Sequence, residues 1–569
     1  MTLPEILGDY VVFFGLVFGL GLPWIVQKNR ESVETLTLAA ACGVLQIYVW
    51  VWTIFVAGLP AATVYLLPVV AAICCMVHRR SICAFLEESD TRSAIGRLLL
   101  FSGWCLGWLA LVRSYGGGEW TGDWFEHFDR AKFFIDDRPL DTQFLGIYGL
   151  TSRPPLANLV AGAGLALRGS TFAHAQVFMT LFSTLLLLPV LLLARHFSGT
   201  RRADAALLVI MMFNPLVIQN STFLWTKLPC AFFVATSLAL YVRALDDTTF
   251  RLVRWSAAAM AGGVLAHYSA APYAAALILL HVARTWMDRR RGGIWQELGV
   301  QAIIVAALLG TWIGWALIHF GWAGTFLDNT SVKMGAGLPI AERLSFGVRA
   351  LWVTLVPHPL LPVDYRFIAQ TSSVGFARDY AFNIYQTTLP GAIGLGGLVC
   401  WVLCRGSLRG GATKRAERVF WTTIVTVVSI LTMAAISGPD RWGIVHITLI
   451  PLVVTGLAWL AAASTQLPSG ARMWWLGALG CDAVLGIVAH FYLQATVWLT
   501  EKDLAAFFAG REFTYSIAVG RNAMLKLMKE VDFIADGGPH PVLVTLLLLA
   551  LGTLALKPVL SPASPVCSG

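Results

Sequence analysis

Long apolar runs, separated by short charge-dense segments, dominate this sequence of 569 residues. Each run is about as long as the roughly 20 residues that an α-helix needs to cross a bilayer. Because a backbone in lipid must satisfy its own hydrogen bonds, open strands are excluded. We therefore predict an all-α polytopic membrane protein with about fifteen transmembrane helices. The predicted spans lie near residues 8–27, 36–57, 61–77, 97–113, 175–194, 204–219, 228–243, 255–267, 271–283, 298–319, 387–404, 420–436, 444–463, 474–496 and 541–557.

Lysine and arginine residues set the predicted orientation, because short cytoplasmic loops carry an excess of both. With these spans, every basic cluster falls on one side, which we assign to the cytoplasm. The N-terminus then lies outside and the C-terminus inside. The net charge of +9 indicates contact with anionic lipid of the bilayer and not with nucleic acid. The clusters are Lys28/Arg30, Arg79/Arg80, Arg195/Arg201/Arg202, Arg243/Arg251/Arg254, Arg284/Arg289/Arg290/Arg291 and Arg405 through Arg418.

Three long polar segments, 114–174, 320–386 and 497–540, all fall on the outer side. They mix Trp, Phe and Tyr with charge, and long ordered connections of this kind are usually functional. The first three spans, in contrast, hold few polar residues and are joined by short loops. We therefore divide the chain into an additional N-terminal membrane module (1–96), a functional core with the first two outer loops (97–463) and C-terminal helices with the third outer loop (464–569).

The first outer loop contains a helical pattern at residues 123–135. On a helix, its polar side chains fall within an arc of about 100° beside an apolar stripe. This predicts an amphipathic helix lying at the membrane surface. A carboxylate there could remove a proton from a hydroxyl, or two carboxylates could hold a divalent cation. The alternative is an N-cap with otherwise solvated charges. The polar residues are Asp123, Glu126, His127 and Arg130.

Further cationic residues lie at the outer ends of other spans. Arg153 precedes two prolines at headgroup level, where a guanidinium suits a phosphate. Lys227 begins a span, His267 lies with Tyr268 at a turn between two short spans, and Arg441 lies in a short loop. Because a cation beside a membrane span is costly, it usually has a partner or a task. These cations could therefore converge on an anionic headgroup.

Each of these residues also has a simpler interpretation. Arg153 could anchor a half-helix at the interface, and Lys227 could extend its ammonium group towards water. His267 could cap a buried helix end, and Arg441 could pair with Asp440. The sequence alone leaves both interpretations open.

In these motifs the chain resembles the GT-C superfamily of integral membrane glycosyltransferases, over roughly 97–460. The nearest branch includes the protein O-mannosyltransferases and the aminoarabinose transferases of lipid A. Each motif alone is weak, so the resemblance rests on the order of the motifs along the chain and on their common side of the membrane. The motifs are Gly122-Asp123-Trp124-Phe125-Glu126-His127, Arg153-Pro154-Pro155-Leu156, Trp225-Thr226-Lys227 and His267-Tyr268.

The resemblance implies a reaction. The donor would be a sugar on a polyprenyl phosphate, and Asp123 would be the general base that deprotonates an acceptor hydroxyl for inverting attack. Lys227, His267 and Arg153 would stabilise the departing phosphate, and Arg441 could join them. The site would face the extracytoplasmic side of a bacterial inner membrane, and the acceptor could be a glycan, a lipid or a protein.

The sequence also departs from the family pattern. Relatives often have two adjacent acidic residues in the first outer loop, whereas Trp124 and Phe125 separate Asp123 from Glu126 here. Which carboxylate is the base, and whether the two hold a metal, therefore stays open. The alternatives to an enzyme are a transporter or flippase for an amphiphilic substrate and a non-catalytic scaffold. A transporter should place polar residues near mid-membrane on broken helices.

Overall fold

In the part of the chain that the computed structural model describes, the protein consists of helices and turns, with one isolated bridge between Phe144 and Tyr148. The helical fold class predicted from the apolar runs is confirmed. The described residues are 1–26, 31–112, 123–136, 138–144, 148–245, 250–287, 294–328, 339–356, 373–405, 415–435, 443–496 and 532–560.

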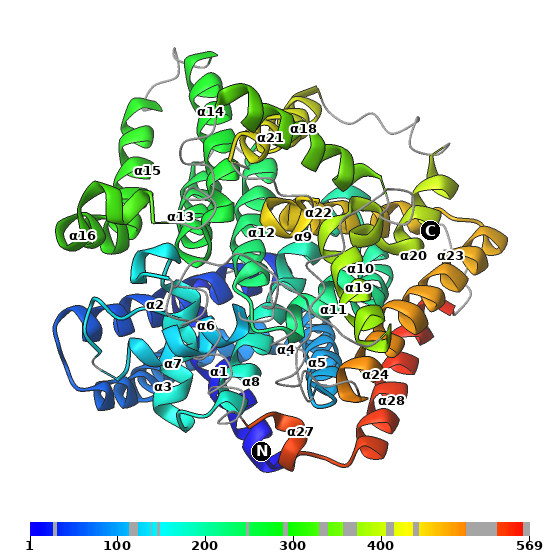
Figure 1. Ribbon diagram of the computed structural model, residues 1–569, viewed down its shortest axis with the longest axis horizontal. Helices are drawn as coiled ribbons and strands as arrows, with labels where there is room; N and C mark the ends of the chain where they lie inside the picture. The colour runs from blue at the N-terminus through cyan, green and yellow to red at the C-terminus, as the bar shows by residue number, and fades with distance from the viewer. Residues whose placement is uncertain are drawn as a thin grey trace.

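The helices pack into one body, with the N-terminal helices at the lower left of Figure 1 and α28 at the right. In chain order they are α1 (Leu3–Ile25), α2 (Ser32–Val56), η1 (Ala61–Tyr65), α3 (Leu66–Val77), α4 (Arg79–Glu87), α5 (Ser89–Leu109), α6 (Asp123–Phe133), η3 (Leu150–Ser152), α7 (Leu156–Arg168), α8 (Phe172–Thr184), α9 (Leu187–Ser198), α10 (Ala203–Phe213), α11 (Pro215–Thr222), α12 (Lys227–Arg243), α13 (Arg251–Ala266), η4 (Tyr268–Ala270), α14 (Ala271–Met287), α15 (Ile294–Leu309), η5 (Gly310–Gly314), α16 (Trp315–Phe326), α18 (Ile340–Leu355), α19 (Ser373–Thr387), α20 (Leu389–Cys404), α21 (Arg415–Ala435), η9 (Val445–Leu449), α22 (Ile450–Ser464), α23 (Ser469–Cys481), η10 (Asp482–Val488), α24 (Ala489–Thr496), α27 (Ile534–Gly537) and α28 (Pro541–Leu560).

Among the described residues, eight helices are long and apolar enough to cross a membrane, or up to eleven if each sharply bent pair counts as one span. The bent pairs include α10 with α11, at 65°, and α19 with α20, at 80°. Shorter helices such as α12, of 17 residues, fall below that length. The predicted number of about fifteen spans therefore stays a prediction.

The centre of the molecule is a helix pair that is apolar on all sides. In the segment Phe172–Ser198, which contains α8 and α9, the most apolar stretch is completely buried. A helix that is hydrophobic all round must be covered by other helices. Here α10, α12 and α22 pack around α9, and α1, α5 and α7 pack against α8.

The first helices share this core. Both α1 and α2 pack against α7, and α2 also contacts α9. Asp9 of α1 is fully buried and pairs with Arg168 Nε at 2.8 Å and with His174 Nδ1 at 2.6 Å. The predicted N-terminal module is thus fastened to the last part of the segment 114–174, which was predicted as the first outer loop.

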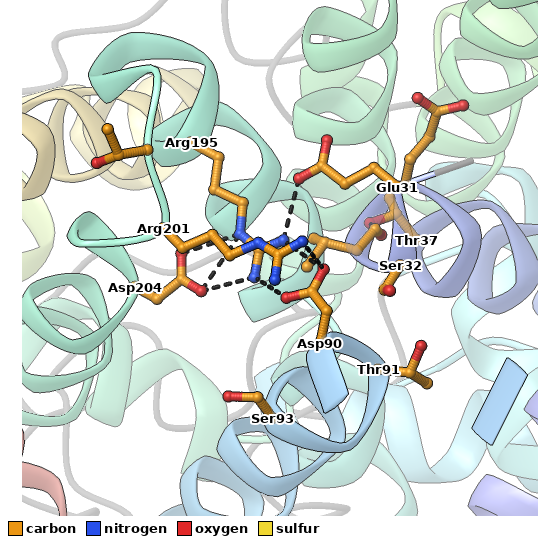
Figure 2. Close-up of polar contacts among 12 residues, drawn as sticks. Glu31, Ser32, Thr37, Asp90, Thr91, Ser93, Arg195, Arg201 and Asp204 are labelled. Carbon is orange, nitrogen blue, oxygen red and sulfur yellow. Dashed lines mark hydrogen bonds and ion pairs between the residues drawn. The ribbon is translucent and has the colours of Figure 1, made fainter. Parts of the chain in front are cut away.

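A buried ionic network joins neighbouring ends of several helices. Arg195, near the end of α9, donates from Nη2 to Asp204 at 2.7 Å and to Asp90 at 3.0 Å. Glu31 accepts from Arg195 at 3.0 Å and from Arg243, at the end of α12, at 2.7 Å. Figure 2 shows the carboxylates converging on Arg195. Because both arginines belong to the predicted cytoplasmic clusters, the network marks the end of the bundle that we assign to the cytoplasm.

Two bent helices support each other where their backbones break. The helix α20 kinks at Gly394, whose φ of 79° favours glycine. Asn214, between α10 and α11, donates to the carbonyl of Ala392 at 2.9 Å. Asp482 accepts from the N–H of Gly396 at 2.7 Å. These side chains replace hydrogen bonds that the kink removes, as a backbone inside a membrane requires.

Candidate active site

The helix predicted in the first outer loop forms as α6. Asp123 and Glu126 lie in its first turn, and Arg130 and Lys132 lie in its last turn. This order places negative charge at the positive end of the helix dipole and positive charge at its negative end. The sequence thus favours a helix at this position even without its packing partners.

The polar side of α6 is buried, as is its apolar side. The exposed fractions are 0% for Glu126, 4% for His127 and 1% for Arg130. The helix α7 packs against α6, and the ring of Phe172 covers the apolar side, 4.8 Å from that of Trp124. The interpretation that these charges are merely solvated is therefore wrong. The position of α6 at the membrane surface stays a prediction.

Asp123 lies among groups from distant parts of the chain. The indole Nε1 of Trp225 donates to its Oδ2 at 3.0 Å, and the charges of Arg153 and Lys227 act on it. Burial raises the pKa of Asp123 above its ordinary value. The charge of Glu126 adds to that rise, whereas the two cations and the indole oppose it.

Glu126 lies between two guanidinium groups. Its Oε1 accepts from Nε of Arg130 at 2.8 Å, and its Oε2 lies 3.5 Å from Nη2 of Arg153. Burial alone would raise the pKa of Glu126, but the charges of Arg153 and Arg130 outweigh it and hold that pKa below its ordinary value. Glu126 is thus the counter-ion of both arginines.

Arg130 holds the turn that precedes Arg153. It donates from Nη1 to the carbonyl of Leu150 at 2.9 Å. From Nη2 it donates to the carbonyl of Gly149 at 2.9 Å and to the hydroxyl of Ser152 at 2.6 Å. Its Nε donates to Glu126, so each of the three guanidinium nitrogens has an acceptor in the protein. Arg130 therefore positions Arg153.

His127 joins α6 to α7. Its Nδ1 lies 3.1 Å from the amide oxygen of Asn158. Burial lowers the pKa of His127 to about 4, although Glu126 opposes the effect. The ring is neutral at neutral pH and supports the helix that carries Asp123.

The two cations of the site each lie near an aromatic ring. The guanidinium carbon of Arg153 is 5.7 Å from the ring centroid of Tyr148. Nζ of Lys227 is 3.6 Å from the ring centroid of Trp225, within the range of a cation–π interaction. Trp225 therefore contacts both Asp123 and Lys227.

His267 lies in the same electrostatic neighbourhood, since the charges of Arg153 and Lys227 act on it. It also caps the start of η4, because its Nδ1 accepts from the N–H of Ser269 at 3.1 Å. His267 therefore both caps a helix end and lies beside the two cations.

Tyr268 supports the same turn as Arg130. Its hydroxyl donates to the carbonyl of Thr151 at 3.1 Å and accepts from Nε1 of Trp312 at 3.2 Å. Tyr268 therefore helps to fix the backbone just before Arg153.

Arg441 and its neighbour Asp440 lie outside the described residues, as do 329–338 and 357–372 of the second outer loop and 497–531 of the third. Their predicted contributions to the site stay predictions.

Three contacts of the site could not be predicted from local sequence patterns. These are the hydrogen bond from Trp225 to Asp123, the ring of Tyr148 near the guanidinium of Arg153, and the amide oxygen of Asn158 beside Nδ1 of His127. Only Trp225 had a signal, since it immediately precedes the Thr226-Lys227 pair of a quoted motif. The other two are single polar residues without a local pattern.

The alternative prediction, that Asp123 and Glu126 hold a divalent cation, has little support from the side chains around them. Among the residues that the structure describes, no three His, Cys, Asp or Glu side chains gather into a cation site. The oxygens of Glu126 face Arg130 and Arg153, and Asp123 accepts from Trp225. Cations of the protein therefore already compensate these carboxylates.

Comparison with known proteins gives distant likenesses in fold. No protein-family model and no curated protein matches the chain. ArnT from Cupriavidus metallidurans bound to undecaprenyl phosphate aligns with a TM-score of 0.46 and 14% identity, over 82% of this chain and 77% of that one. The archaeal oligosaccharyltransferase AglB from Archaeoglobus fulgidus aligns with 0.41 and 12%, over 77% and 60%. The arabinosyltransferase EmbB from Mycobacterium smegmatis aligns with 0.39 and 12%, over 88% and 45%. At TM-scores below 0.5, these likenesses assign neither an activity nor site residues.

Proposed function

We propose that this chain is a GT-C type membrane glycosyltransferase, which moves a sugar from a polyprenyl phosphate to an acceptor hydroxyl on the extracytoplasmic side. The observation that carries the proposal is the convergence of one partly buried carboxylate, Asp123, with the cations Arg153 and Lys227 and with His267. These residues come from four separate stretches of the chain. The sequence resemblance supplies the reaction that suits this set.

In the proposed reaction, Asp123 accepts the proton of the acceptor hydroxyl. The hydroxyl oxygen attacks the anomeric carbon and forms the new glycosidic bond, while the bond from that carbon to the phosphate oxygen breaks. The lipid phosphate leaves with the electron pair, and the anomeric configuration inverts. Because negative charge grows on the phosphate, Arg153 and Lys227 would stabilise the transition state more than the ground state.

Asp123 suits the base role better than Glu126 does. A base must be able to hold a proton, and burial raises the pKa of Asp123, whereas two arginines hold that of Glu126 low. Glu126 would instead align Arg153 for the phosphate, with His267 and Arg441 as further partners of that phosphate. No step in this scheme requires a metal.

The test is Asp123→Asn, because an amide can still accept the N–H of Trp225 but cannot take the proton. In a strain that lacks the gene, we expect the wild type to restore the missing glycan, as measured by mass spectrometry. The Asp123→Asn variant should instead reduce transfer by about 10²-fold or more and leave the lipid-linked donor to accumulate. Its yield and melting temperature should match those of the wild type.

The matched control is Asp129→Asn. Asp129 lies on the same helix but is partly exposed and pairs with Arg138, so this variant should restore the glycan. Normal transfer by Asp123→Asn would show that Asp123 is not the base. A wild type without any effect on glycans or lipid-linked sugars would refute the enzyme itself.

A further inference from the structure

Four buried amide side chains form a second polar group near the candidate active site. We name Gln219, Asn220, Asn383 and Gln386 the amide layer; each is at most 1% exposed. Asn220 donates to Gln386 at 3.0 Å, and Gln386 donates to Gln219 at 3.1 Å. The layer thus joins α11 to α19, and the proposed reaction does not use it.

The aromatic rings of Phe382 and Trp225 connect the amide layer to Asp123. The ring of Phe382, on α19 beside Asn383, is 5.7 Å from that of Trp225, which donates to Asp123. The ring of Phe382 is also 5.8 Å from that of His490. The amide layer therefore borders the site through Phe382.

The hydrogen bonds of the layer are incomplete. Nε2 of Gln219, Oδ1 of Asn220, Oδ1 of Asn383 and Nδ1 of His490 have no hydrogen-bond partner among the described residues. Buried polar atoms in native proteins nearly always have a partner, either protein, water or ligand. Four such atoms, on residues of α11, α19 and α24, indicate that something else completes them.

The unpaired atoms define the chemistry of that partner. They comprise an amide N–H donor and two amide oxygens, with an imidazole nitrogen beside them. A phosphate only accepts hydrogen bonds, so it would oppose the oxygens. A cation would meet the N–H donor of Gln219 and the nearby guanidinium of Arg378, whose charge acts on His490. A hydroxyl both donates and accepts, and an aromatic wall suits the C–H surface of a sugar ring.

We infer that the amide layer binds the hydroxyl groups of an uncharged sugar ring. The inference rests on the proposed function, because it names the part of the site that recognises a sugar in that reaction. The sugar could belong to the lipid-linked donor or to the acceptor, and the chemistry is the same for both. The experiment must separate these two sources.

The first arm measures the donor. The purified protein in nanodiscs binds undecaprenyl phosphate or the same lipid phosphate carrying glucose, mannose, galactose or N-acetylglucosamine. We expect the wild type to bind one of the glycosylated lipids more tightly than the bare phosphate. Gln219→Met and Asn383→Leu should reduce that gain at least about fivefold, with unchanged affinity for the bare phosphate.

The second arm measures the acceptor. Methyl glycosides of the same four sugars are added to protein saturated with undecaprenyl phosphate, and their binding is followed by calorimetry. If the layer serves the acceptor, the wild type binds one glycoside and the two variants lose at least about fivefold in affinity. Gln301→Met is the control in both arms, since Gln301 is a buried amide bonded to Glu297 far from the site, and it should change neither affinity.

The outcomes distinguish this inference from the proposed function. If the wild type does not bind undecaprenyl phosphate, the proposed function fails. If it binds the phosphate but neither arm shows a contribution from the sugar, the inference is overturned. It is also overturned if the sugar contributes equally in the wild type and the variants, while only their melting temperatures fall. The layer would then only join α11 to α19, with water completing its hydrogen bonds.

Discussion

Asp123 and Glu126 lie one turn apart on α6, yet their neighbours give the two carboxylates opposite properties. Glu126 has a guanidinium on each oxygen, so it is charged at any physiological pH. Asp123 has an indole N–H as its hydrogen-bond donor, and burial dominates its pKa. The sequence predicts both acids but not which is the base, because the difference comes from Trp225 and Arg153, far away in the chain.

Transfer should therefore depend on pH through Asp123. A general base acts only when deprotonated, so activity should rise with pH through its pKa and be lost as pH falls below it. Because the pKa of Asp123 is raised, the acid limb should lie above the value of about 4 for an ordinary aspartate. The pH profile of kcat/KM for the free enzyme measures this directly. An acid limb at or below about 4 would contradict the assignment.

Replacing Trp225 with Phe should move that limb. The indole N–H lowers the pKa of Asp123, so its loss should shift the midpoint to higher pH. The aromatic ring beside Lys227 remains, although it holds a cation less strongly. Trp475→Phe is the control, because its buried indole has no hydrogen-bond acceptor in the described part of the chain. A downward shift, or equal shifts in both variants, would argue against the hydrogen bond.

At the scale of elements, the turn that precedes Arg153 depends on α6. Arg130→Lys keeps the charge but cannot reproduce the fork that binds two carbonyls and a hydroxyl of the turn. We expect a melting temperature several degrees lower, from the loss of about 2 kcal/mol or more, and weaker binding of undecaprenyl phosphate. Arg138→Lys, a partly exposed ion pair of the same segment, should change both by little. Equal effects in the two variants would refute a positioning role.

Local patterns predicted α6, because its polar side chains fall within one arc of a helix beside an apolar stripe. The kink of α20 was not predictable in the same way. Its sequence is apolar throughout, and the Asp482 and Asn214 side chains that stabilise the break come from other helices. Broken helices, which are typical of transporters, here have side-chain partners that complete their backbone hydrogen bonds.

The kink gives a prediction at this scale. Gly394→Ala should lower the melting temperature, because its φ of 79° is unfavourable for alanine. In addition, a Cβ there would lie 2.7 Å from Oδ2 of Asp482. Gly456→Ala should leave the melting temperature unchanged or raise it slightly, since Gly456 lies inside α22 with open space beside it. Equal melting temperatures for the two variants would show that the kink does not need glycine.

At the scale of the whole molecule, the candidate site and the ionic network lie at opposite ends of α12. Lys227 begins α12 and Arg243 ends it, 17 residues in all, or about 25 Å apart along the axis. The basic residues of the sequence predicted this separation, because they assign the Arg243 end to the cytoplasm. The fastening of α1 through Asp9 was not predictable, since Arg168 and His174 give no local signal of such a partner.

This separation predicts which residues an impermeant thiol reagent can reach in intact cells. Cys83 is exposed on α4, which leads directly into α5 and its Asp90 in the ionic network. It should therefore react only after the membrane is opened. A cysteine at position 132, introduced by Lys132→Cys, lies on α6 where the lysine side chain is 32% exposed, and it should react in intact cells. Peptide mass spectrometry identifies the labelled residue in each case. If the two residues react from the same side, the separation is wrong. If Cys83 reacts in intact cells and position 132 only in opened ones, Asp123 faces the cytoplasm, and the proposed extracytoplasmic reaction must be abandoned.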